Sequence, residues 1–155
     1  MKKNLVFIFF GAIFIISCKD DKAIPKPPAR ESYWIINGDT FITKGQAVNI
    51  GKTISNLNSG DSITGFGISF YFGEGLPNYG TWEIAQRKDS INQDPGLVHI
   101  SFNYKVKNYN YPTNQYYITG RDSSGKAQLI LSPTWFVNRY NSEDSIKIQG
   151  TFNEP

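Results

Sequence analysis

Apolar and polar residues alternate along most of the chain after residue 31. In the segment 97–106 every second residue is apolar: Val98, Ile100, Phe102, Tyr104 and Val106. The residues between them, which include His99 and Asn103, are polar. A period of two residues predicts a strand with one buried face and one solvated face, as in an antiparallel sheet.

The same period marks further strands, and turn signals separate them. Asn37-Gly38 lies between the β-rich segments 33–36 and 40–43 and predicts a hairpin. Other strands are expected at 62–72, where Phe66, Ile68, Phe70 and Phe72 share a face, and at 81–86, 116–120, 127–132, 135–140 and 144–152. The last pair is expected to turn at Asn141-Ser142-Glu143. Because no window keeps a helical period, we expect an all-β fold, an antiparallel β-sandwich or small β-barrel of about eight to ten short strands in a single domain at 32–155.

The first residues follow a different pattern. Lys2-Lys3 precede an apolar run from Leu5 to Ile16, which is typical of a secretory signal. The run is shorter than the roughly 20 helical residues that cross a membrane. Ile15-Ile16-Ser17-Cys18 resembles the lipobox of bacterial lipoproteins, which implies removal of residues 1–17 and attachment of lipid, palmitate included, to Cys18. The alternative is an ordinary secretory signal with an incidental cysteine.

The residues behind Cys18 point to a surface address. Lys19-Asp20-Asp21-Lys22 resembles the export signal of surface lipoproteins from the Bacteroidota, which implies an outer-membrane protein that faces outward; a periplasm-facing protein is the alternative. Pro25, Pro27 and Pro28 follow, so 18–31 is expected to be a lipidated, proline-rich tether. The membrane is therefore an expected partner, reached through the lipid.

Charge excludes one class of ligand. The chain has 16 basic and 13 acidic residues, and loss of Lys2 and Lys3 with the signal leaves 14 basic residues. The remaining chain is nearly neutral, so we expect no nucleic acid partner.

Three short segments carry a second resemblance. YWIINGDTF near residue 33, NYGTWEI near residue 78 and IKIQGTFN near residue 146 are similar to a pattern in small Bacteroidota lipoproteins. That family largely lacks an assigned activity, so the resemblance supports the β-rich fold and implies no catalytic residue.

The residues that catalysis and metal binding require are scarce. With one histidine and one cysteine, the chain cannot supply the three or four nitrogen or sulfur ligands of a zinc site. We therefore expect no catalytic residue, no metal and no cofactor. A polysaccharide hydrolase remains as an alternative, because Glu74, Glu83 and Asp89 could supply the two carboxylates of that mechanism.

The surplus of tyrosine and asparagine suggests binding instead. The segment 103–117 is rich in both residues, and within it Tyr109 and Tyr111 are expected in a polar, proline-bearing loop; Tyr with Asn is typical of adaptable recognition surfaces. The hypothesis is a non-enzymatic envelope module that binds a glycan or a protein; the alternatives are rings that merely cover a sheet edge, or an accessory subunit of an envelope complex. The candidate binding residues are Tyr79, Trp82, Tyr109, Tyr111, Asn114 and Tyr116.

Overall fold

The computed structural model describes residues 30–50, 54–60, 63–70, 75–77, 79–85, 96–123 and 125–155, and these residues form strands and turns without a helix. The strands are β1 (Glu31–Ile36), β2 (Asp39–Lys44), β3 (Gln46–Ile50), β4 (Ile54–Gly60), β5 (Thr64–Phe70), β6 (Gly80–Ile84), β7 (Leu97–Tyr104), β8 (Lys107–Pro112), β9 (Tyr117–Ser123), β10 (Lys126–Asn138) and β11 (Asn141–Asn153). The expected all-β fold is confirmed. Within these residues no helix has the length and apolarity that a membrane span requires.

The strands form one continuous sheet that closes on itself. Strands β10, β9, β6, β7 and β8 pair in turn, and β8 pairs back to β10, which makes a small barrel of five strands. Every pair is antiparallel except β6 and β7. Two extensions leave the barrel: β11, β1 and β2 beyond β10, and β5, β4 and β3 beyond β7.

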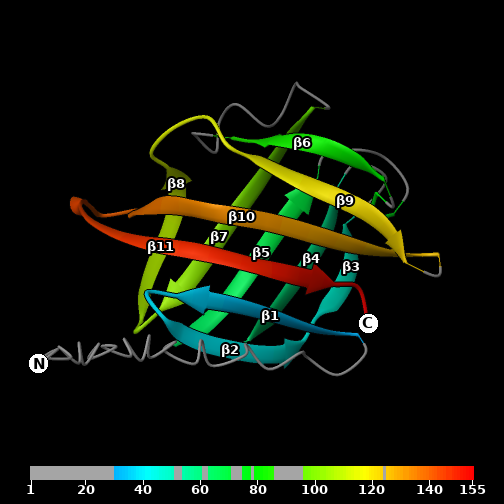
Figure 1. Cartoon of the computed structure of the whole chain (residues 1–155), viewed down its shortest axis with the longest axis horizontal. Coiled ribbons are helices and arrows are strands. Elements are labelled where there is room, and N and C mark those ends of the chain that lie inside the picture. Colours follow the sequence, from blue (N-terminus) through cyan, green and yellow to red (C-terminus); the bar gives the residue numbers. More distant parts are fainter. Residues whose placement is uncertain are drawn as a thin grey trace, which may run out of the picture.

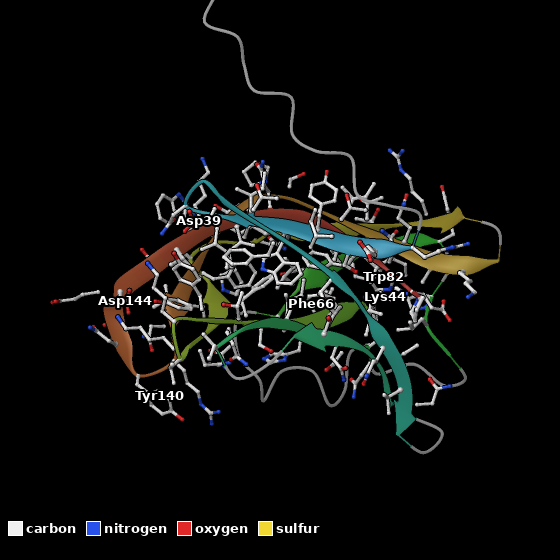
Figure 2. The ribbon with its side chains drawn as sticks, turned by 90° about the horizontal axis from the view of Figure 1, so that it is seen from below. Asp39, Lys44, Phe66, Trp82, Tyr140 and Asp144 are labelled. Carbon is white, nitrogen blue, oxygen red and sulfur yellow. The ribbon has the colours of Figure 1, made fainter. Side chains whose placement is uncertain are left out.

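The extensions face each other, so the molecule has two layers. Figure 1 shows β6, β9, β10, β11, β1 and β2 in front, and β8, β7, β5, β4 and β3 crossing behind them. Strand β2 continues into β3 and carries the chain from the front layer to the back layer (Figure 2). Gly45 lies at this corner, where an added Cβ would sit 3.0 Å from both the Asn153 carbonyl oxygen and the Leu57 side chain. Glycine therefore fits this close approach, and any side chain here would require its neighbours to shift.

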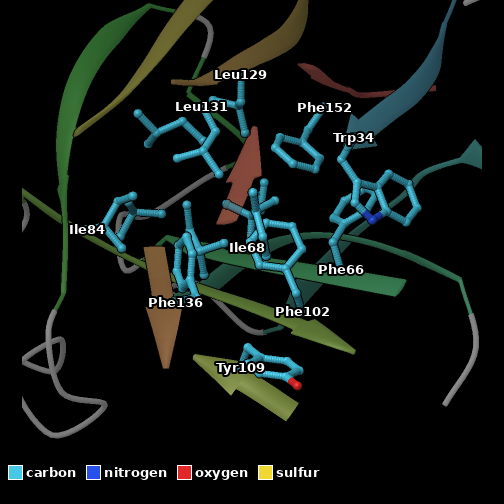
Figure 3. Packing of buried hydrophobic residues seen from close by; sticks show 14 of the residues in the cluster. Trp34, Phe66, Ile68, Ile84, Phe102, Tyr109, Leu129, Leu131, Phe136 and Phe152 are labelled. Atoms are coloured by element: carbon cyan, nitrogen blue, oxygen red, sulfur yellow. The ribbon is translucent and has the colours of Figure 1, made fainter. Parts of the chain in front are cut away.

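The space between the layers is filled with aromatic and branched side chains. Phe66 and Phe152 lie 4.7 Å apart between ring centroids, and Trp34 meets the edge of Phe66 at 5.1 Å. Phe102 and Phe136 form a second edge contact at 5.2 Å (Figure 3). The alternation in the sequence therefore predicted this core correctly over β5 and β7, where Phe66, Ile68, Phe70, Val98, Ile100 and Phe102 are all buried.

Several strand boundaries differ from the expectation, and three differences matter most. The strand expected at 97–106 ends at Tyr104, because Lys105 and Val106 form the turn between β7 and β8; Val106 is 75 % exposed instead of buried. The strands expected at 127–132 and 135–140 are one strand, β10, and it turns into β11 at residues 139–140 instead of at 141–143. Strand β1 begins at Glu31, one residue before the expected start of the domain.

Candidate functional site

Two of the candidate binding residues are core residues. Tyr109 was expected in an exposed loop, but residues 107–112 form β8, which completes the barrel, and the Tyr109 ring is only 2 % exposed. Trp82 is 7 % exposed and packs edge-on against Phe70 at 5.4 Å. Trp82 and Ile84 are two residues apart in one strand, so alternation already placed them on the same buried face. The abundance of aromatic and asparagine residues was therefore misleading for both Trp82 and Tyr109. Neither ring is available to a ligand.

The other candidates do not gather into one site. Tyr79 is 84 % exposed before β6, and Asn114 is exposed after β8. Tyr116 is half-buried and packs against the core. Tyr111 lies in β8 and pairs with Val137 of β10, but the Tyr111 side chain is not among those that the structure describes. Cys18, the whole predicted signal and most of the predicted tether also lie outside the described residues.

The outer face of the front layer carries a hollow whose described lining includes none of the candidate binding residues. A shallow depression of about 310 Å³ lies over β1, β10 and β11 and is lined by Ile35, Asn37, Gly38, Trp135, Lys147, Ile148 and Gln149. We call it the Trp135 hollow. Trp135 is 42 % exposed, which is unusual for so large an apolar ring.

Register places the walls of the Trp135 hollow opposite one another. Trp135 of β10 faces Lys147 of β11, and Gln149 of β11 faces Ile35 of β1. Directly opposed side chains on one face of an antiparallel pair have Cβ atoms about 4.5–5.5 Å apart. The indole, the ammonium and the amide therefore form one compact surface.

A bulge in β10 turns Trp135 outward. Between Leu131 and Thr134 the pairing with β11 skips one residue, so β10 has one residue more than its partner there. The Thr134 hydroxyl donates a hydrogen bond of 2.7 Å to the Ser132 carbonyl across this bulge. Because an extra residue exchanges the two faces of a strand, odd-numbered residues are buried before the bulge and even-numbered ones after it. Phe136 therefore points into the core and Trp135 points out.

The β1–β2 turn forms the rim of the hollow and is held in place from two sides. Asn37 and Gly38 have φ values of 49° and 97°, as the tight turn requires. The Asn37 backbone N–H donates to the Lys147 carbonyl, and the Lys147 N–H donates to Asn37 Oδ1, both at 3.2 Å. On the other side, the Tyr104 hydroxyl donates to Asp39 Oδ2 at 2.9 Å. The rim is therefore set before any ligand arrives.

A carboxylate closes the β10–β11 end of the barrel, at the end where Asp39 also lies (Figure 2). Asp144 accepts hydrogen bonds from Lys107 Nζ and Asn138 Nδ2 at 2.9 Å and from the Tyr109 hydroxyl at 3.2 Å. The hydrogen bonds from Lys107 and Asn138 hold the pKa of Asp144 below its ordinary value, whereas burial raises the pKa of Tyr109. These contacts tie β8 to the last hairpin, which is a structural role.

Side chains that could bind a metal ion do not cluster in the described residues. There, no group of three His, Cys, Asp or Glu side chains could hold a metal ion. Of the three carboxylates considered for a hydrolase, Glu83 lies on β6, and Glu74 and Asp89 lie outside the described residues. Comparisons with protein families, curated proteins and solved structures find no match to this chain.

Proposed function

We propose that this protein is a non-enzymatic, lipid-anchored binding module of the cell envelope that holds a saccharide at the Trp135 hollow. The observation that carries the proposal is an exposed indole on the outer face of the sheet, with the side chains of Gln149 and Lys147 in the same hollow. The Tyr/Asn loops of the original hypothesis give way to this surface.

The chemistry of the hollow suits a sugar. A pyranose has an apolar face of C–H groups that lies flat on an aromatic ring, and its rim carries oxygens that hydrogen-bond to polar side chains. Small-molecule sites combine an apolar surface with a few fixed polar groups, and the volume of about 310 Å³ is at the lower end of their range. The described residues that line the hollow include no carboxylate, histidine or cysteine, and Lys147 is the single ionisable group among them, so the supported role of these residues is binding.

A binding assay on the full chain in detergent tests the saccharide. A polysaccharide array should give specific binding that Trp135→Ala reduces about tenfold or more, since loss of stacking and burial removes the main contact. Tyr140→Ala is the matched control, because Tyr140 is an aromatic residue that is 82 % exposed outside the hollow. Equal binding by wild type and Trp135→Ala would refute the proposed site.

The anchor is the second part of the proposal, and it rests on the resemblance of residues 15–18 to a lipobox and of residues 19–22 to a surface-export signal. The expected result is incorporation of labelled palmitate into the wild type and none into Cys18→Ala. If both proteins incorporate palmitate equally, the lipid is not at Cys18. Protease shaving of intact cells then separates outward display from a periplasm-facing protein.

An accessory role in an envelope complex is the second candidate, because one edge strand of the sheet has no second partner strand among the described residues. Strand β3 ends the strand order, its residues 46–49 are exposed, and none of its five residues is charged or a proline. Such an edge can pair with a strand of another chain. Val48→Lys should abolish a partner complex that Ile42→Lys, on the opposite end strand β2, leaves intact. Equal recovery of the complex with both variants would dismiss this candidate.

A further inference from the structure

Lys147 gives the Trp135 hollow a charge and suggests the class of its ligand. It is the one ionisable side chain among the described residues that line the hollow, and it is exposed. We infer that the saccharide bound there is acidic, with the carboxylate of a uronic acid received by the Lys147 ammonium while the sugar ring lies on Trp135. This inference rests on the proposed function and adds the ligand class to it.

The charge of Lys147 is free for a ligand. Lys107, on β8, is neutralised by Asp144 at 2.9 Å, but Lys147 forms no ion pair with any residue in the described ranges. The backbone of Lys147 is fixed by its two hydrogen bonds with Asn37. The Lys147 side chain therefore extends from a fixed backbone position next to Trp135. No acidic residue among the described residues of the hollow competes with a ligand for the ammonium.

Position favours a carboxylate on the rim of a stacked sugar. Lys147 and Trp135 are directly opposed across β10 and β11, so their side chains leave the sheet at adjacent positions of the hollow. The carboxylate of a uronic acid projects from the edge of the pyranose ring. A sugar stacked on Trp135 therefore presents this group within reach of Lys147, where the two form a charge-assisted hydrogen bond.

The balance of donors and acceptors points the same way. An ammonium has three donors and no acceptor, and Gln149 adds an amide that can donate as well. The side-chain oxygen Oδ1 of Asn37 already accepts a hydrogen bond from the Lys147 backbone N–H. At the position of the carboxylate, a neutral sugar carries a primary hydroxyl that both donates and accepts, whereas a uronic acid carries a charged group that only accepts. The hollow therefore matches an acidic sugar better than a neutral one.

The test compares each acidic polysaccharide with its own neutral form. Polygalacturonate, alginate and hyaluronate are each offered beside the carboxyl-reduced polymer, in which a primary hydroxyl replaces the carboxylate. The full chain in detergent should bind at least one acidic polymer about tenfold more tightly than its reduced form, as a charged hydrogen bond allows. This preference should shrink as salt rises, because salt screens exposed charges.

Variants assign the preference to residues. Lys147→Gln should bind the acidic and reduced polymers alike, and Trp135→Ala should weaken binding to both. Lys44→Gln is the matched control, because Lys44 is exposed toward the other end of the molecule (Figure 2). This variant should keep the preference for the acidic polymer. Near-ultraviolet circular dichroism confirms that each variant is folded.

The outcomes separate the two proposals. Equal binding of acidic and reduced polymers by the wild type, with loss of both in Trp135→Ala, overturns the acidic ligand and supports the proposed function. A preference that survives in Lys147→Gln overturns the role of Lys147. No binding to any of the three pairs overturns the acidic ligand, and binding of other saccharides that Trp135→Ala leaves unchanged overturns the proposed function as well.

Discussion

At the scale of single residues, Asp144 makes stability depend on pH. Its hydrogen bonds with Lys107, Asn138 and Tyr109 favour the carboxylate and lower its pKa in the folded state. A carboxyl group whose pKa falls on folding adds stability above its unfolded value, here 3.8, and loses that contribution as the pH falls through the folded pKa. Wild type should therefore be more stable than Asp144→Asn at pH 7, and the difference should close below pH 3.8. Denaturant unfolding from pH 7 to pH 2 measures it, and a constant difference would contradict the assignment.

The turn between β7 and β8 is a strained local conformation. Lys105 and Val106 both have positive φ, at 51° and 66°, and a β-branched residue is unfavourable there. Because Val106 is 75 % exposed, its replacement by glycine costs little packing. Val106→Gly should raise the free energy of unfolding by about 1 kcal/mol. Val48→Gly, in the exposed strand β3, is the control and should lower it; a loss of stability in both variants would show that the turn is not strained.

At the scale of elements, the bulge in β10 decides which face carries Trp135. Deletion of Pro133 removes the extra residue and makes the pairing with β11 regular, while Trp135 stays outside and Phe136 stays inside, so we expect the free energy of unfolding to change by less than about 1 kcal/mol. An alanine inserted between Thr134 and Trp135 moves Trp135 to the core face and Phe136 to the outer face, and should lower the free energy of unfolding by more than about 3 kcal/mol. Denaturant unfolding compares the two variants. Equal stabilities would contradict this assignment of faces in β10.

The same bulge explains why the sequence did not reveal the site. Alternation predicted β5, β7 and the final strand, and the Asn37-Gly38 signal predicted the β1–β2 hairpin, because each of these depends on neighbouring residues. Counting in twos from Leu131 places Trp135 in the core, and only the extra residue at Ser132–Pro133 corrects it. Proline within a strand is the signal that could have marked the change of face.

At the scale of the whole molecule, long-range pairing limits what sequence can predict. The closure of the barrel by β8 was missed, because Tyr109 lies in a polar segment whose burial depends on its pairing with both β7 and β10. The hollow likewise depends on pairing between residues more than a hundred positions apart, such as Ile35 and Gln149. Local patterns specify strands and faces, but they do not specify which strands become neighbours.

The two layers are held together by a single aromatic core. Phe152 of β11 contacts Phe66, Phe102 and Trp34 with ring centroids 4.7, 5.9 and 6.4 Å away, so it links both layers. Phe152→Ala should lower the free energy of unfolding by about 3–5 kcal/mol, because the surrounding rings cannot close the cavity. Tyr140→Ala removes an exposed ring and should change it by less than about 0.5 kcal/mol. Similar effects in urea unfolding would contradict this account of the core.

The indole N–H signals of the three tryptophans report directly on binding at the Trp135 hollow. Trp34 and Trp82 are buried at 1 % and 7 % exposure, whereas Trp135 is 42 % exposed in the hollow. In a ¹H–¹⁵N spectrum of the full chain, addition of a bound polysaccharide should shift one indole signal, the one that Trp135→Phe removes. Unchanged indole signals, or shifts confined to the two buried tryptophans, would contradict binding at the Trp135 hollow.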